Sequence, residues 1–103
     1  MVIEWLQFQM APEHRERFIA ADTEIWTDAL TPYPGFVAKE VWITPEDETT
    51  VVVVVRWASR EQWKAIPEAE VRRIEQQFQT ALDFEYTLVA SSEYQVRRFQ
   101  RPN

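Results

Sequence analysis

The sequence predicts an α+β fold, a ferredoxin-like βαββαβ sandwich in which two helices cover one face of a four-stranded antiparallel sheet. Three observations support it: an unbroken run of five valines, apolar residues that switch between strand and helix spacing, and turn residues between the segments. In this fold the first and third strands lie in the middle of the sheet. The 103 residues are enough for one domain, residues 1–103, and too few for two.

The run Val51 to Val55 is the strongest strand signal, and it falls where the third strand is expected. Successive side chains of a strand point to opposite faces, so both faces of this strand avoid water, as in a central strand covered on each side. Two helices cover only one face of the sheet. We therefore expect a homodimer in which two sheets pack face to face.

The first strand is expected over residues 2–10, and the first helix follows it. Pro12 suits the first turn of a helix, and apolar residues continue at helical spacing to about Leu30. A Pro-Gly turn then ends the helix. Gly35 is the only glycine of the chain, and we expect it to have a positive φ.

The second strand is expected over 36–44, and the second helical segment begins with a capping box formed by Ser59 and Gln62 and is divided by a proline. The final strand is expected over 84–99 with an interruption at Ala90, Ser91 and Ser92. Its distal half, Glu93 to Phe99, is expected to extend onto the partner subunit.

Composition excludes several classes of function. A net charge of −6 opposes binding to nucleic acid and to anionic membranes, because Lys and Arg drive both. The chain has no cysteine, hence no disulfide or thiolate nucleophile, and a single histidine argues against a metal site. The N-terminus does not resemble an export signal, and no apolar run of about 18 residues is present, so we expect a cytoplasmic protein.

Three residues are candidates for catalysis: Glu4, Arg56 and His14. Glu4 and Arg56 lie on strands that are expected to be antiparallel neighbours, and we expect both to face the helices and to meet. Such a pair is either a cross-strand ion pair or an arginine that positions an anionic or phenolate oxygen beside a carboxylate. His14 lies in the first helical turn, as an exposed histidine or as a general base.

Aromatic residues form the candidate ligand pocket. Two interpretations are open for them, because aromatic residues at helical or strand spacing either fill a core or line a flat pocket for a planar molecule. Trp5 and Trp42 are instead expected in the dimer interface, where aromatic side chains are enriched. The five pocket candidates are Trp26, Trp57, Trp63, Phe78 and Tyr86.

Two segments carry a family resemblance. Pro34-Gly35-Phe36 leads into the second strand, and Val55-Arg56-Trp57-Ala58-Ser59-Arg60-Glu61-Gln62-Trp63 leads into the second helix. With the predicted order of elements, they resemble the antibiotic biosynthesis monooxygenase-like domains of the dimeric α+β barrel superfamily, in particular the small stand-alone members. The resemblance covers nearly the whole chain and implies a dimeric barrel with a pocket between sheet and helices in each subunit.

Relatives of this kind include cofactor-independent oxygenases of phenolic polyketides, haem-degrading enzymes and isomerases. The haem-degrading enzymes use an Asn, Trp and His triad, whereas residues 59–82 contain no histidine and Asn103 is the only asparagine. The resemblance therefore implies no haem, and we expect no cofactor and no metal. Two functions remain: a cofactor-independent monooxygenase acting on a small aromatic or hydrophobic molecule, and a non-catalytic dimeric module that binds a small ligand or is purely structural.

Overall fold

A computed structural model describes residues 1–102 of the chain; Asn103 lies outside the described residues. The first helical segment contains a 3-10 turn, η1, and a π-helical segment, η2. The elements in chain order are β1 (Val2–Met10), η1 (Pro12–His14), α1 (Arg15–Ala21), η2 (Asp22–Thr27), α2 (Asp28–Leu30), β2 (Phe36–Thr44), β3 (Asp47–Trp57), α3 (Arg60–Lys64), α4 (Glu68–Ala81) and β4 (Tyr86–Gln95).

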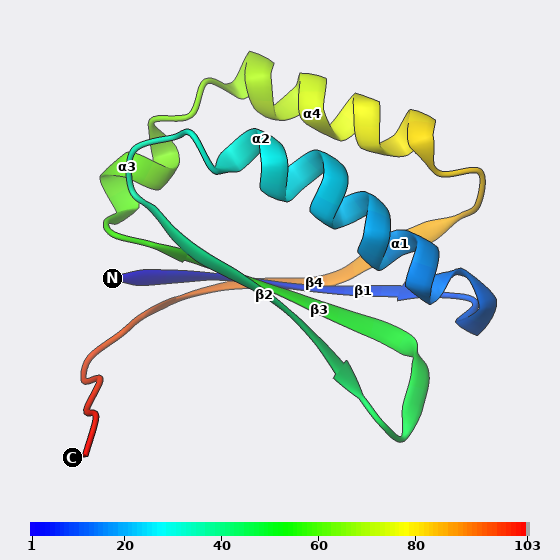
Figure 1. Cartoon of the computed structure of the whole chain (residues 1–103), viewed down its shortest axis with the longest axis horizontal. Coiled ribbons are helices and arrows are strands. Elements are labelled where there is room, and N and C mark those ends of the chain that lie inside the picture. The colour runs from blue at the N-terminus through cyan, green and yellow to red at the C-terminus, as the bar shows by residue number, and fades with distance from the viewer. Residues whose placement is uncertain (103) are drawn as a thin grey trace.

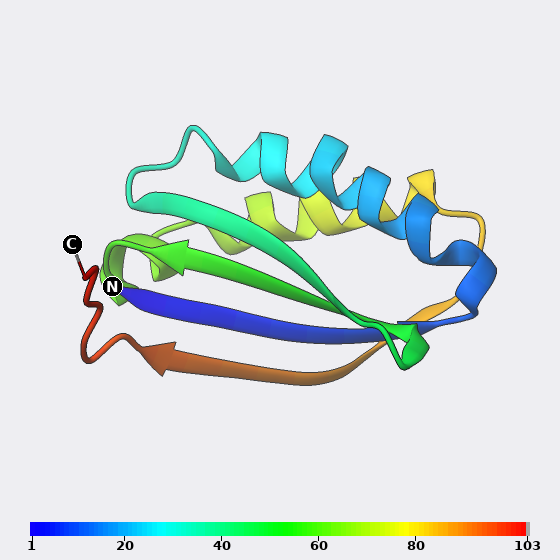
Figure 2. The same cartoon turned by 60° about the horizontal axis from the view of Figure 1, so that its bottom comes forward.

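The four strands form one antiparallel sheet in the order β2-β3-β1-β4. The helices all lie on one face of this sheet, and the opposite face is bare (Figure 1). Figure 2 shows β3 and β1 in the middle, between β2 and β4. The predicted ferredoxin-like sandwich is thus confirmed, with the valine run on a central strand.

The register of β1 on β3 decides which side chains face the helices. Glu4 lies opposite Val55, and Ile3 lies opposite Arg56. Directly opposite residues of an antiparallel pair point to the same face. The helix-facing side therefore carries Glu4, whereas Arg56 belongs to the bare side of the sheet.

The hydrophobic core lies between the sheet and the helices. Trp57 and Phe18 are each 1% exposed, and Phe78 is 2% exposed. The Phe18 and Phe78 rings meet edge to face with centroids 5.3 Å apart, an arrangement that aromatic pairs favour. These large side chains hold the first helical segment, α4 and β3 in fixed positions, and those elements also form the walls of the site described below.

The predicted turn before β2 is confirmed. Gly35 has a φ of 92°, which residues with a Cβ rarely adopt. A Cβ at this position would also lie 2.5 Å from Gln62 Cβ, so the turn and α3 are in close contact. Ser59 Oγ accepts a hydrogen bond from the Gln62 backbone N–H at 3.1 Å, which is the serine half of the expected capping box. Gln62 Oε1 accepts a hydrogen bond from the Ser59 hydroxyl at 3.1 Å instead of from the backbone.

The final strand differs from the prediction. Ala90, Ser91 and Ser92 pair with β1 instead of interrupting β4, and a register shift opposite Gln7 and Phe8 absorbs the irregularity. The strand ends at Gln95, so the expected extension over residues 93–99 is not a strand beyond that point. None of the helices within residues 1–102 has the length and apolar character needed to cross a membrane.

Candidate functional site

A cavity of about 310 Å³ lies between the helix-facing side of the sheet and the helices. Its walls come from all four strands and from α2, α3, α4 and the π-helical segment η2. The volume is at the lower end of the range of about 300 to 1,000 Å³ typical of ligand pockets. The structure places all five aromatic pocket candidates in its wall, namely Trp26, Trp57, Trp63, Phe78 and Tyr86.

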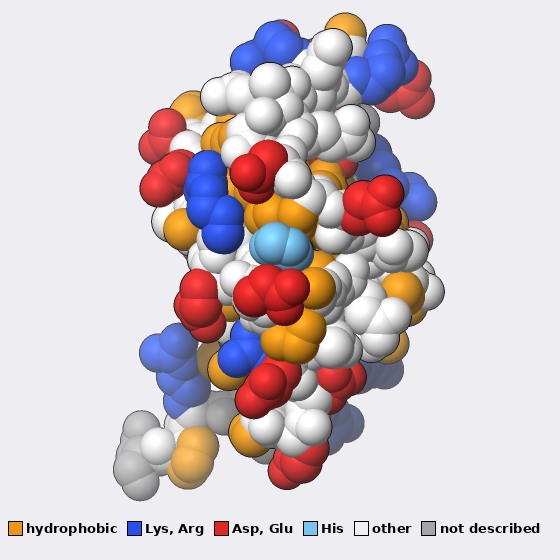
Figure 3. All heavy atoms as spheres, turned by 90° about the vertical axis from the view of Figure 1, so that its right-hand side faces the viewer, with side chains coloured by type: hydrophobic (Ala, Val, Ile, Leu, Met, Phe, Trp, Pro, Cys, Tyr) orange, Lys and Arg blue, Asp and Glu red, His pale blue; other side chains and the backbone are white. Residues whose placement is uncertain are grey.

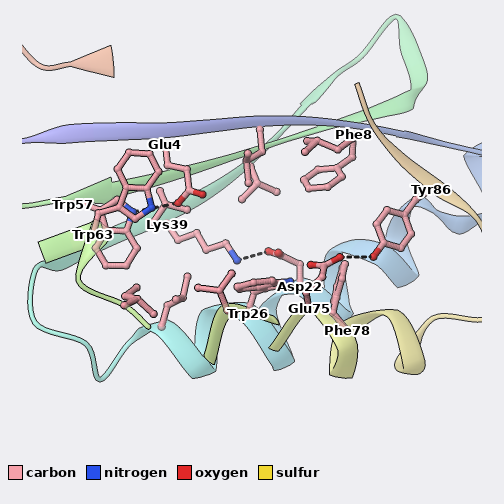
Figure 4. A pocket seen from close by; sticks show the side chains of 17 residues that line it. Glu4, Phe8, Asp22, Trp26, Lys39, Trp57, Trp63, Glu75, Phe78 and Tyr86 are labelled. Atoms are coloured by element: carbon pink, nitrogen blue, oxygen red, sulfur yellow. Dashed lines mark hydrogen bonds and ion pairs between the residues drawn. The ribbon is translucent and has the colours of Figure 1, made fainter. Parts of the chain in front are cut away.

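Three carboxylates follow one another along this mostly apolar cavity, each with its own hydrogen-bonding or ionic partner. Figure 4 shows Glu4 beside Trp57 at one end, Asp22 beside Lys39 in the middle, and Glu75 beside Tyr86 at the other end. Charged groups are rarely buried unless they are paired. Their presence here distinguishes the cavity from a simple packing defect.

The central pair is buried almost completely. Lys39 Nζ lies 2.7 Å from Asp22 Oδ2, and the two side chains are 4% and 6% exposed. Burial raises the pKa of Asp22 and lowers the pKa of Lys39, while the attraction between the two charges opposes both shifts. Within residues 1–102 the ammonium is the only partner of that carboxylate oxygen.

The π-helical segment places Asp22 at the cavity. Such segments are rare and are found frequently at functional sites. Asp22 and Trp26 both belong to η2 and both line the cavity. An aspartate in the apolar stripe of the helix thereby meets a lysine in the helix-facing row of β2.

Glu4 occupies the end of the cavity near α3. Trp57 Nε1–H donates a hydrogen bond of 3.3 Å to Glu4 Oε1. Burial raises the pKa of Glu4, and the Trp57 hydrogen bond and the charges of Lys64 and Lys39 oppose this shift. A carboxylate with a raised pKa is a stronger base when it is ionised, which suits proton abstraction near neutral pH.

Glu75 lies on α4 at the opposite end. It accepts a hydrogen bond of 3.1 Å from the Tyr86 hydroxyl and another of 3.1 Å from Gln79 Nε2. Burial and the neighbouring Glu75 charge raise the pKa of Tyr86, so the phenol stays protonated and keeps donating. We therefore expect Glu75 to form part of the surface that contacts a ligand and not to act as a free base.

The expected meeting of Glu4 and Arg56 is wrong. Arg56 lies on the bare face of the sheet, where its Nε is 2.8 Å from Glu40 Oε1. The reason is the register, because Arg56 is opposite Ile3 and the neighbouring Val55 is opposite Glu4. A difference of one residue along a strand moves a side chain to the other face.

His14 lies outside the cavity, at the end of the molecule that Figure 3 presents. Its ring stacks on Phe84 with centroids 4.2 Å apart and planes at 3°. The figure shows the single histidine at the surface, with acidic and hydrophobic side chains around it. This placement favours the interpretation of a partly exposed histidine near a helix start.

Sequence reasoning missed Asp22, Lys39 and Glu75. The signal for the first two is a charged residue in an apolar row: Asp22 falls between Phe18 and Ile25 at helical spacing, and Lys39 alternates with valines. Glu75 carries no such signal. Among the described residues, no cluster of three or more histidine, cysteine, aspartate or glutamate side chains could hold a metal ion.

Comparison with known proteins shows which family the sequence belongs to. The family model described as antibiotic biosynthesis monooxygenase matches residues 1–73, which include the cavity residues of the first three strands and of the first helical segment. The chain belongs to this family. The antibiotic biosynthesis monooxygenase assignment confirms the resemblance seen in the sequence. No curated protein matches the chain.

Solved structures show the same fold at low sequence identity. SnoaB, a cofactor-independent oxygenase from Streptomyces nogalater, is 17% identical over 95% of this chain and 94% of its own, with a TM-score of 0.66. A monooxygenase of Streptomyces coelicolor in complex with nanaomycin D is 16% identical over 99% and 92%, with a TM-score of 0.73. A dimeric ferredoxin-like protein from an uncultured marine organism is 16% identical over 97% and 98%, with a TM-score of 0.74.

Proposed function

We propose that the protein is a cofactor-independent monooxygenase that oxidises a small aromatic molecule bound in the cavity. The observation that carries the proposal is the buried ion pair of Asp22 and Lys39 beside Glu4 in an otherwise aromatic and aliphatic cavity. The matching monooxygenase family and the cofactor-independent oxygenase among the similar structures support it. The cavity volume suits a molecule of two or three fused rings.

Each charged residue has one role in this proposal. Glu4 accepts a proton from an acidic C–H or O–H of the substrate. Lys39 holds the resulting phenolate or enolate oxygen by a charge-assisted hydrogen bond, and Asp22 keeps the ammonium charged and in position. The aromatic walls bind the rings and exclude water, which strengthens both electrostatic interactions.

The substrate itself supplies all the electrons that reduce O₂. Its carbanion donates to O₂, a C–O bond forms, and the resulting hydroperoxide loses water to leave a carbonyl group. One oxygen atom of O₂ enters the product and the other leaves as water, while a CH₂ group becomes C=O or a phenol becomes a quinone. The reaction therefore balances without an external reductant.

Oxygen uptake tests the proposal. With an anthrone or a dihydroxynaphthalene as substrate and a chelator present, we expect one O₂ consumed per molecule of quinone formed and one atom of ¹⁸O₂ in the product. Tryptophan fluorescence, measured without oxygen, reports binding separately, since Trp26, Trp57 and Trp63 line the cavity. Binding without oxygen uptake would instead identify the non-catalytic ligand-binding module, and absence of both would contradict both ligand-dependent functions and leave the purely structural module.

We also propose that the bare face of the sheet is the interface of a homodimer. This face carries Trp5 and Trp42 in the registers opposite Val54 and Val52, and Trp42 is 44% exposed. Exposed apolar patches on a sheet mark association sites. The dimeric ferredoxin-like protein among the similar structures supports the formation of a dimer.

Light scattering tests the dimer. The wild-type chain of 12.3 kDa is expected at twice that mass at micromolar concentration, and Trp42→Asp at the monomer mass, because a buried unpaired carboxylate opposes association. Glu48→Asn, an exposed change in the β3 region, is the control and should stay dimeric. A wild-type monomer would contradict the proposal.

A further inference from the structure

A second hollow of about 320 Å³ adjoins the cavity and shares Glu4, Leu6 and Trp63 with it. Glu4 and Trp63 lie at the same end of the cavity in Figure 4, which places the hollow beyond that end. The shared residues make the two spaces neighbours. A molecule with its rings in the cavity would therefore have this hollow next to it.

The hollow arises from the part of β4 whose sequence predicted an interruption. Ser91 lies opposite Leu6, and Glu93 lies opposite Glu4, so both share the helix-facing side with the cavity residues. Earlier in the same strand this side carries the larger Tyr86. The short serine side chain leaves space there while the strand continues unbroken.

Polar groups of both charges line the hollow. Ser91 contributes a hydroxyl, Glu93 contributes a carboxylate, and Lys64 contributes an ammonium that sits 4.0 Å above the centre of the Trp63 ring. Ser92 also borders the hollow, but it lies opposite Trp5, so its hydroxyl belongs to the bare face of the sheet. Arg60 Nε is 3.1 Å from Glu93 Oε2 and neutralises that carboxylate. The lining thus offers donors and acceptors without a strong excess of either charge.

This charge balance indicates the class of ligand. An anionic group would meet Glu4 and Glu93, and a cationic group would meet Lys64 and the nearby Arg60. A neutral polyol avoids both conflicts, because each hydroxyl donates and accepts. The Trp63 ring adds a flat surface that can cover the apolar face of a sugar ring.

We propose that this hollow is a subsite for a neutral polyhydroxylated group, such as a glycosyl unit, attached to the aromatic molecule in the cavity. The inference rests on the proposed function, because the aromatic part of the ligand must occupy the cavity. It adds a second recognition element at the α3 end. The Ser91 hydroxyl is its specific donor and acceptor.

Anaerobic titration with three related probes tests the subsite. The probes are 1,5-dihydroxynaphthalene, its monomethyl ether and its mono-β-glucoside, and tryptophan fluorescence reports binding. We expect the glucoside to bind about tenfold more tightly than the methyl ether, as two additional hydrogen bonds predict. Ser91→Val should remove this advantage and leave the dihydroxynaphthalene affinity unchanged, because valine suits a strand but offers no hydroxyl.

Thr87→Val is the matched control, since it removes a hydroxyl from the same strand at an exposed position outside the hollow. It should keep the advantage of the glucoside. Equal affinities of glucoside and methyl ether, or an advantage that survives Ser91→Val, would overturn the subsite. Failure of all three aromatic probes to bind would instead contradict the proposed function, so the two failures are distinguishable.

Discussion

Replacing Lys39 with methionine is expected to lower oxygenase activity by about 10²- to 10³-fold, the usual cost of losing a charged stabiliser of a developing oxyanion. Methionine is one atom shorter than lysine; it keeps an unbranched apolar stem, with sulfur in place of one methylene, and lacks the ammonium. The measurement is the rate of oxygen uptake at saturating substrate.

The same substitution is also expected to destabilise the fold, by about 3 to 5 kcal/mol, because it leaves the Asp22 carboxylate buried without its partner. Protonation of Asp22 would relieve part of this cost, since burial already raises its pKa. Urea unfolding measures the difference. A loss of activity in the single variant alone would therefore be open to a structural explanation.

A second variant separates stability from chemistry. In Asp22→Leu with Lys39→Met, both charges are gone and apolar groups face an apolar cavity, so stability should return to the wild-type value or exceed it. Activity should stay as low as in the single variant. A double variant that regains both stability and activity would show that the ion pair has a structural role only.

The layered arrangement of helices over one sheet could be predicted from the sequence. Five consecutive valines predicted a central strand, and the Pro-Gly pair at Gly35 predicted a turn with a positive φ; both predictions follow from local chemistry. The aromatic wall of the cavity could also be predicted from the sequence, because Trp57 and Phe78 lie on the core-facing side of their elements. Such patterns are short-range and need no knowledge of partners.

The polar part of the site could not be predicted from the sequence in the same way. Asp22 and Lys39 meet only because a π-helical segment packs over β2, and a π-helical turn has no distinctive sequence signal. Arg56 was misplaced because its side chain was assigned to the helix-facing side of its strand, whereas the register opposite Ile3 puts it on the bare face. Both results depend on long-range packing, which residue spacing alone does not define.

Replacing Glu4 with glutamine is expected to lower activity by about 10²-fold or more, because the proposed proton acceptor is lost while Trp57 Nε1 can still donate to the amide oxygen. The wild-type rate should rise with pH through the folded-state pKa of Glu4, which burial holds above 4.5. The variant should lack this rise. A pH profile of oxygen uptake measures both effects.

Stability should respond to pH in the opposite direction. The folded state binds the Glu4 proton more tightly than the unfolded state, so this group's contribution is present below pH 4.5 and is lost as pH rises through the folded pKa. Glutamine does not titrate. Glu4→Gln should therefore match the wild type in acid and be more stable than the wild type at neutral pH.

Stability and activity together distinguish three possible roles of Glu4. A structural carboxylate would leave a variant that is stable and active, and a carboxylate essential for folding would leave one that is unstable and inactive. A proton acceptor held in a buried site leaves a variant that is at least as stable and inactive. Glu48→Gln, which removes an exposed carboxylate from the β3 region, is the charge control and should retain both properties of the wild type.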